Sequence, residues 1–290
     1  MRIKNSFWLV IFLIPALIIF CLIFGASVIT LFSTTFTEWR LASSIEFIGI
    51  KNYMDLFKDG DFLKALSNTV IWTILQSTIH IFIGVTFALI LAKKQFYWKF
   101  ARTVYMIPNI ISSAALGMVY LSIFNPKFGA VNSLIRLLGI KNFEQNWFMD
   151  YSTAFFTVTI TWLPFAAVVS ILVLAEMAAI PESILEASKI DGADDFKTNI
   201  YIILPLLRNI IGTCVIVAST SMLKNFDLIF MTTNGGPGNT TLNLPLYIYK
   251  TSMLENNYGY ANTVGAFLII FGIVLLVTVN KAFRMGQSDT

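Results

Sequence analysis

The stretch Ala65–Ala92 reads ALSNTVIWTILQSTIHIFIGVTFALILA and contains no Asp, Glu, Lys or Arg. A helix needs about 20 mostly apolar residues to cross the roughly 30 Å of hydrocarbon in a lipid bilayer. This stretch is long enough and apolar enough for that purpose. It therefore predicts a transmembrane helix over residues 66–92.

Five more apolar stretches occur in the chain, one before this stretch and four after it. Lys224 and Asp227 interrupt only the fifth of the resulting six. Pro15, Pro108 and Pro164 lie within stretches, where neighbouring helices can satisfy the backbone groups that a proline frees. The sequence therefore predicts an all-α integral membrane protein, with a single transmembrane domain over residues 1–290. The expected spans are about 7–31, 66–92, 103–125, 152–175, 207–231 and 260–281.

The composition separates this chain from soluble classes. Hydrophobic residues make up 57% and charged residues 12%, whereas a soluble domain carries about 25% charge. The mean hydropathy is +0.75. These values exclude a soluble globule, a disordered chain and, despite a net charge of +4, a typical nucleic-acid binder. Cys21 and Cys214 lie in apolar runs, where we expect small buried residues rather than a disulfide or metal pair.

Basic residues predict the orientation of the spans, because cytoplasmic loops are enriched in Lys and Arg. They precede the first span, fill the link between the second and third, and follow the last. We therefore expect a multi-pass protein of the bacterial cell (inner or plasma) membrane, with both termini cytoplasmic. The basic residues are Arg2, Lys4, Lys93, Lys94, Lys99, Arg102, Lys281 and Arg284.

The loop of residues 176–205 is cytoplasmic by this alternation, yet it is acidic. Its pattern predicts two short helices: Pro181 suits a first helical turn, Gly192 suits the left-handed conformation that ends a helix, and Asp194 and Asp195 can start a second helix that Pro205 ends. A small apolar patch accompanies the first helix, at Ile180, Ile184, Leu185 and Ala187. We expect this patch to dock on a partner protein. The alternative is a helix on lipid headgroups, which would normally be rich in Lys and Arg.

Part of this loop resembles a known motif. Glu186-Ala187-Ser188 is followed after three residues by Gly192, and after nine more by Ile202-Ile203-Leu204-Pro205. The pattern resembles the EAA loop of bacterial ABC importer permeases, with Ser188 as its one departure. Other segments resemble the sugar-type branch, which includes multiple-sugar, maltose and glycerol-phosphate permeases. They are Phe47–Tyr53, Leu66–Thr69, Lys224–Asp227 and Thr233–Thr241.

The resemblance implies a type I ABC importer permease architecture with six transmembrane helices. It implies that the chain is half of a translocation path for a sugar or oligosaccharide and not an enzyme. The implied partners are a second, similar permease, two ATPase subunits and an external solute-binding protein. The residues implied to couple to the ATPases are Glu186, Ala187, Ser188, Asp191, Gly192, Leu204 and Pro205.

No cofactor or metal is expected. Gly235-Gly236-Pro237-Gly238 is interpreted as a sharp outer turn, because a P-loop requires a Gly-Lys pair and the chain has none. Any ATP must therefore be hydrolysed by another subunit. His80 is the only histidine and lacks the companions of a metal site. A neutral His80 hydrogen-bonded between helices is favoured, with a polar wall for solute as the alternative.

The solute path is expected to combine aromatic rings with hydrogen-bonding groups, since sugars present apolar ring faces and many hydroxyls. Tyr120, Trp162, Asn225 and Asp227 are the candidates. Packing or anchoring at the membrane interface is the alternative role for Tyr120 and Trp162. Lys224 and Asp227 could form a gate or merely a local ion pair at the end of the fifth helix.

Two other function classes compete with the importer. An ion-coupled secondary transporter would need intramembrane charges and often shows internal repeats. Lys224 and Asp227 are the only such charges, and the halves show no convincing repeat. A scaffold without transport would leave the acidic loop without a clear purpose.

Overall fold

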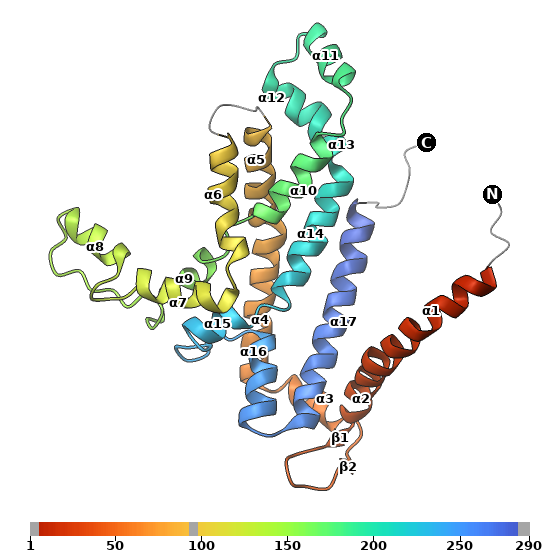
Figure 1. The fold of residues 1–290 in the computed structure, drawn as a ribbon. Helices are drawn as coiled ribbons and strands as arrows, with labels where there is room; N and C mark the ends of the chain where they lie inside the picture. The colour runs from red at the N-terminus through yellow and green to blue at the C-terminus, as the bar shows by residue number, and fades with distance from the viewer. Residues whose placement is uncertain (1–5, 93–97, 284–290) are drawn as a thin grey trace. The chain divides into compact units, whose positions relative to one another are not determined.

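The computed structural model describes residues 6–92 and 98–283, and nearly all of its elements are helices (Figure 1). Within these residues three helices are long and apolar enough to cross a membrane: Phe12–Thr34, Gly60–Leu91 and Tyr258–Phe283. Three bent pairs of helices raise the number of candidate spans to six, if each pair is one span. The pairs are Trp98–Ile110 with Ser113–Ile123, Ala167–Met177 with Glu182–Ile190, and Asp195–Leu206 with Arg208–Met222. The predicted all-α membrane class is confirmed.

The chain divides into two compact units. Unit 1 is Met1–Phe62 with Tyr247–Ile270, and unit 2 is Leu63–Leu246 with Phe271–Thr290. The boundary falls within α4 (Gly60–Leu75), α16 (Leu244–Tyr249) and α17 (Tyr258–Phe283). Of the basic residues used to predict orientation, Arg2, Lys4, Lys93, Lys94 and Arg284 lie outside the described residues.

Unit 1 begins with one long apolar helix, formed by α1 (Ser6–Phe20), a wide π-helical turn (Cys21–Gly25) and α2 (Ala26–Thr34). The strands β1 (Thr37–Glu38) and β2 (Glu46–Phe47) then form an antiparallel hairpin in which Thr37 faces Phe47. The helix α3 (Lys51–Leu56) follows. Cys21 is exposed on the long helix, so only Cys214 fits the expected buried position.

Side chains of unit 1 fasten α3 to the end of α2. The Asn52 amide donates to the carbonyls of Thr35, at 2.9 Å, and Thr37, at 3.0 Å. The rings of Phe57, Phe62 and Phe267 pack edge to face. The last carbonyls of a helix have no partner within the helix. By donating to the carbonyls of Thr35 and Thr37, the Asn52 amide fixes the chain just after α2 ends.

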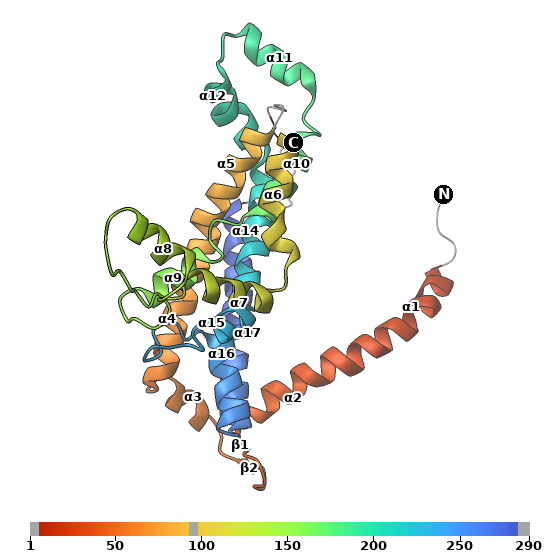
Figure 2. The ribbon, with the colours of Figure 1, turned by 60° about the vertical axis from the view of Figure 1, so that its left-hand side comes forward.

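Unit 2 contains a bundle of long helices, with shorter helices around it (Figures 1 and 2). The helix α10 packs against α5, α6 and α14, and α7 packs against α15. Both views place α11 and α12 beyond the ends of α10 and α14. The bounds are α5 Ile81–Leu91, α6 Trp98–Ile110, α7 Ser113–Ile123, α8 Ala130–Leu137, α9 Ala154–Ile160, α10 Ala167–Met177, α11 Glu182–Ile190, α12 Asp195–Thr198, α13 Leu204–Leu206, α14 Arg208–Met222 and α15 Asp227–Thr232.

Small residues allow the bundle helices to approach closely. A Cβ on Gly84 of α5 would lie 2.6 Å from the Val169 side chain of α10, so only glycine fits there. The Ser170 hydroxyl donates to the Gly84 carbonyl at 2.8 Å across the same crossing. Small residues and interhelical hydroxyl bonds are typical of membrane helix packing. Large apolar side chains such as Phe82 and Phe100 are exposed, as expected for residues that contact lipid.

The third, fourth and fifth predicted spans are not continuous helices. The chain bends by 104° between α6 and α7. The region predicted as 152–175 contains α9 and α10, separated by a non-helical segment at Thr161–Ala166. The region predicted as 207–231 contains α14 and α15, separated at Leu223–Phe226. Non-helical backbone at membrane depth is tolerated where it is buried in protein or lines a cavity.

Candidate functional site

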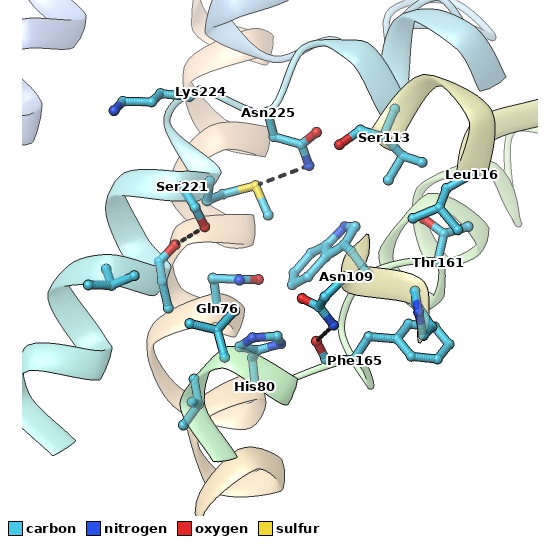
Figure 3. A pocket seen from close by; sticks show the side chains of 18 of the residues that line it. Gln76, His80, Asn109, Ser113, Leu116, Thr161, Phe165, Ser221, Lys224 and Asn225 are labelled. Carbon is cyan, nitrogen blue, oxygen red and sulfur yellow. Dashed lines mark hydrogen bonds between the residues drawn. The ribbon is translucent and has the colours of Figure 1, made fainter. Parts of the chain in front are cut away.

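A cavity of about 380 Å³ lies within unit 2 (Figure 3). Its walls come from α6, α7, α10, α14 and α15, from the turn that joins α4 to α5, and from both helix breaks. Three of the four candidate path residues, Trp162, Asn225 and Asp227, line it. Segments far apart in the sequence therefore meet at one largely apolar cavity, into which several polar and aromatic side chains are set.

The break between α9 and α10 forms one wall, and side chains from other helices satisfy its backbone. Three consecutive carbonyls, of residues 163–165, lie within hydrogen-bond distance of these side chains. The pairs are His80 Nδ1 with Leu163 O at 2.9 Å, Tyr105 Oη with Pro164 O at 2.7 Å, and Asn109 Nδ2 with Phe165 O at 3.3 Å. The predicted role of His80, a hydrogen bond between helices, thus has its partner in Leu163. Buried carbonyls need hydrogen-bond partners, so these side chains stabilise the interrupted helix.

Two buried polar atoms of the lining have no hydrogen-bond partner. They are the amide oxygen of Gln76 and the indole nitrogen of Trp162. An unsatisfied buried donor or acceptor costs about 1–3 kcal/mol, and a bound molecule with hydroxyl groups could remove that cost. Sequence reasoning missed Gln76, whose amide lies in an otherwise ordinary apolar stretch.

Lys224 and Asp227 do not form the ion pair considered from the sequence. The salt bridge found in the described part of the chain joins Arg40 to Glu38, at 3.4 Å. Lys224 follows the end of α14, whereas Asp227 is the first residue of α15, so the two residues do not share one helix face. Asp227 lies at the positive end of its short helix, and the Lys224 side chain extends away from Asn225 and Ser113 (Figure 3).

Tyr120 does not line this cavity. Its half-buried ring lies on α7 and packs against Phe124, with the ring centroids 6.3 Å apart. The bend between α6 and α7 explains the difference. It turns α7 away from the direction of α6, which a straight third span would have continued.

The loop of residues 176–205, called here the EAA segment after the motif it resembles, forms the two expected short helices, α11 and α12. Gly192 has a φ of +77°, so it adopts the predicted left-handed conformation. The Gly192 N–H donates to the Lys189 carbonyl at 3.1 Å, and the Ala193 N–H donates to the Ser188 carbonyl at 3.0 Å. This pair of bonds is the Schellman motif, in which a left-handed residue closes the helix end.

Hydrogen bonds also fix the second helix of this segment. The Asp194 carboxylate caps α12 by accepting from the Lys197 N–H at 2.8 Å. The hydroxyls of Ser188 and Thr198 lie 3.3 Å apart and join α11 to α12. Ser188, the residue that departs from the EAA pattern, therefore has a structural role here. The helical chain passes Pro205 and ends one residue later, at Leu206, where a 70° bend precedes α14. A proline and a wide helical turn, here Asn199–Ile203, are common causes of such bends.

The exposed apolar surface of this segment differs from the predicted patch. Ile180 and Leu185 pack against the core of unit 2 instead of facing outward. The most exposed apolar side chains are Ile190, Phe196 and Tyr201, at 85%, 71% and 75% exposure. These three residues lie on segments whose mutual arrangement depends on the Gly192 turn.

The turn that follows α15 is held by a distant segment of unit 2. The Asn68 amide donates to the carbonyls of Thr240 and Leu242, at 3.0 and 2.8 Å. The Leu244 N–H donates to the Thr69 hydroxyl at 3.0 Å. Two of the segments that carry the family resemblance are therefore in contact. No group of His, Cys, Asp or Glu residues suited to a metal ion occurs in the described residues 6–92 and 98–283.

Comparisons with known proteins match this architecture. The model of a family described as "Binding-protein-dependent transport system inner membrane component" matches residues 80–284. The chain is 33% identical to the multiple sugar-binding transport system permease protein MsmF of Streptococcus mutans, over 98% of this chain and 99% of that protein. It is 27% identical to the probable ABC transporter permease protein YurN of Bacillus subtilis, over 96% and 97%.

The fold also matches a solved structure. A chain of a bacterial alginate ABC transporter, solved in complex with an alginate pentasaccharide-bound periplasmic protein, superposes with a TM-score of 0.84 at 21% identity. The match covers 98% of each chain. The similarity therefore extends over both units and shows a common fold.

Proposed function

Because the chain belongs to the family of binding-protein-dependent transport system inner membrane components, we propose that it forms half of the translocation path of an ABC importer for a sugar or oligosaccharide. The chain is a permease subunit and not an enzyme, since ATP hydrolysis in this family belongs to separate subunits. The sugar assignment is supported by relatives such as MsmF and by the aromatic and hydrogen-bonding side chains in the lining of the cavity.

The solute path in this proposal runs through the cavity of unit 2. Trp162 supplies an aromatic ring, and Asn225 supplies an amide beside it in the lining. Asp227 adds a carboxylate at the start of α15. A second, similar permease would supply the other half of the path, and an external binding protein would deliver the solute.

The ATPases in this proposal dock on the EAA segment. The supporting residues are Glu186, Ala187, Asp191 and Pro205, which are exposed. The exposed apolar residues Ile190, Phe196 and Tyr201, called here the coupling face, add to this surface. Ser188 and Leu204 are less accessible and would shape the segment from within. By the distribution of Lys and Arg, this segment and both termini lie in the cytoplasm. Nucleotide and loaded binding protein would each favour one of two access states, because only differential binding shifts such an equilibrium.

The observation that carries the coupling role is the left-handed turn at Gly192. It closes α11, redirects the chain into α12 and leaves the coupling face exposed. A left-handed conformation costs a residue with a Cβ about 1–2 kcal/mol, and a β-branched residue is affected more strongly. Nothing lies within 4 Å of a Cβ built on Gly192, so a substitution there acts through backbone strain and not through a clash.

The test replaces this glycine in the assembled transporter. Gly192→Val should leave the complex in the membrane but reduce sugar uptake at least tenfold relative to ATP hydrolysis. The matched control is Gly139→Val, because Gly139 has a φ of +102° and also has open space around its Cβ. The control should preserve the ratio of uptake to hydrolysis. Equal ratios in both variants would contradict the coupling role.

A further inference from the structure

We propose that the cavity of unit 2 selects a neutral, hydroxyl-rich solute unit, such as an uncharged sugar ring, over a carboxylated one. Gln76 and Trp162 are the residues that determine this specificity. The inference rests on the proposed transport function and goes beyond it by naming the charge class of the solute. It follows from the hydrogen-bonding capacity that the lining leaves unused.

Gln76 contributes a free acceptor. Its side chain is 7% exposed, and its amide oxygen has no partner. It begins the π-helical turn Gln76–His80, which interrupts the long helix between α4 and α5. Both ends of this turn line the cavity. Single π-helical turns inside α-helices frequently occur at functional sites, and the unpaired amide oxygen buried at this turn can accept a hydrogen bond from a ligand.

Trp162 contributes a free donor and an apolar surface. Its indole N–H is buried without a partner, in the break between α9 and α10. A buried indole N–H normally finds a hydrogen-bond partner. A solute hydroxyl can accept from this N–H, while another hydroxyl donates to Gln76. The indole ring also offers a face for the apolar side of a sugar ring.

The remaining polar groups of the lining include two further acceptors. The Asn109 amide nitrogen donates to the Phe165 carbonyl. The amide oxygen of Asn109 therefore remains available to a ligand. His80 donates from Nδ1 to the Leu163 carbonyl, because a carbonyl can only accept. The neutral ring then presents Nε2 as an acceptor. Gln76, His80 and Asn109 all point into the cavity (Figure 3).

The charges of the lining do not compensate an anionic solute. Among the described residues that line the cavity, Lys224 carries a positive charge and Asp227 carries a negative charge. Lys224 is exposed and extends away from the cavity residues Asn225 and Ser113. A carboxylate would therefore lose its hydration without a paired cation and would face acceptor oxygens, which is costly in a low-dielectric site. A hydroxyl-rich neutral unit avoids both costs.

The experiment measures solute affinity with the whole transporter in lipid nanodiscs. The probes are a panel of neutral di- and trisaccharides and the matching saccharides carrying a carboxylate at C6. We expect the neutral members to bind more tightly than their carboxylated counterparts. Gln76→Met keeps the length of the side chain but removes the free amide oxygen, and Trp162→Phe keeps an aromatic ring but removes the indole N–H. Each should weaken binding of the preferred neutral saccharide by about 3- to 10-fold.

The control is Trp98→Phe, because Trp98 begins α6 and does not line the cavity. It should leave the affinity unchanged. Equal or tighter binding of carboxylated saccharides, or unchanged affinity in both cavity variants, would overturn the inference. In either case the transporter would still bind and import saccharides, so the proposed function would stand. If no saccharide of either class bound or stimulated ATP hydrolysis, the proposed function itself would be wrong.

Discussion

The carboxylate of Asp59 is surrounded by hydrogen-bond donors in unit 1. The Tyr260 hydroxyl donates to it at 2.8 Å, and the Tyr247 hydroxyl donates to the same oxygen. The N–H groups of Asp61, at 2.9 Å, and Phe62, at 3.3 Å, donate to the other oxygen. Burial opposes ionisation, but these donors outweigh burial and hold the Asp59 pKa below its ordinary value of 3.8. The charged form therefore stabilises the folded state.

This lowered pKa gives a prediction with a defined sign. The stabilising contribution of Asp59 is complete above its ordinary pKa and is lost as the pH falls through the lowered, folded-state value. Asp59→Asn should therefore lower the melting temperature of the purified complex at about pH 6. The difference from the unsubstituted protein should shrink as the pH falls below about 4.

The control for this prediction is Asp55→Asn, which removes the same charge from an exposed position on α3. It should change the melting temperature little at either pH. A difference between Asp59→Asn and the unsubstituted protein that stays constant across the acid range would contradict the account.

Single residues of the cavity were predictable only in part. Trp162 was identified because an indole N–H in an apolar span needs a partner, and the structure places it in the lining without one. Gln76 gave no comparable signal, because the π-helical turn that orients it depends on packing against other helices. Tyr120 shared the chemistry of Trp162, but the bend before α7 removed it from the cavity.

At the level of elements, the sequence predicted the helical content and the two short helices of the EAA segment. It could not place the breaks. Pro164 was expected within a continuous span, yet the helix stops at Ile160 and resumes at Ala167. The break is stable because side chains of other helices, such as Tyr105 of α6, satisfy its carbonyls. Such long-range partners do not appear in a local sequence pattern.

The coupling face provides a prediction at the same scale. Burying a Phe side chain contributes about 1.5–3 kcal/mol, so docking of an ATPase over Phe196 should depend on its ring. Phe196→Ser should weaken ATPase binding by roughly 10-fold or more. The measurement is the affinity between the detergent-solubilised permease pair and the purified ATPase subunits.

Phe128→Ser is the matched control for that measurement. Phe128 is 72% exposed, almost the same as Phe196, but it lies before α8 and far along the chain from the EAA segment. Its substitution should leave ATPase affinity unchanged. Equal weakening by the two substitutions would indicate a general loss of folding, and unchanged affinity in Phe196→Ser would show that the coupling face does not bind the ATPases.

For the whole molecule, the family resemblance and the helix pattern both predicted an all-α membrane protein, and that class is confirmed. Asn68 and Thr240 carry parts of that resemblance and are in contact through the Asn68 amide. The helix pattern predicted six spans without placing their bends, whereas the candidate spans among the described residues are three single helices and three bent pairs. The helix breaks that line the cavity interrupt the helical sequence pattern. That pattern is therefore least informative at the residues where function is expected.

The central claim is that this chain imports a saccharide with energy from ATP hydrolysed by partner subunits. The most direct measurement is saccharide uptake into proteoliposomes that contain the assembled permease pair, its ATPases and the binding protein. The account predicts uptake that requires ATP and the binding protein and is insensitive to collapse of proton and sodium gradients. Uptake that proceeds without ATP and stops when an ion gradient is collapsed would contradict it and identify an ion-coupled secondary transporter.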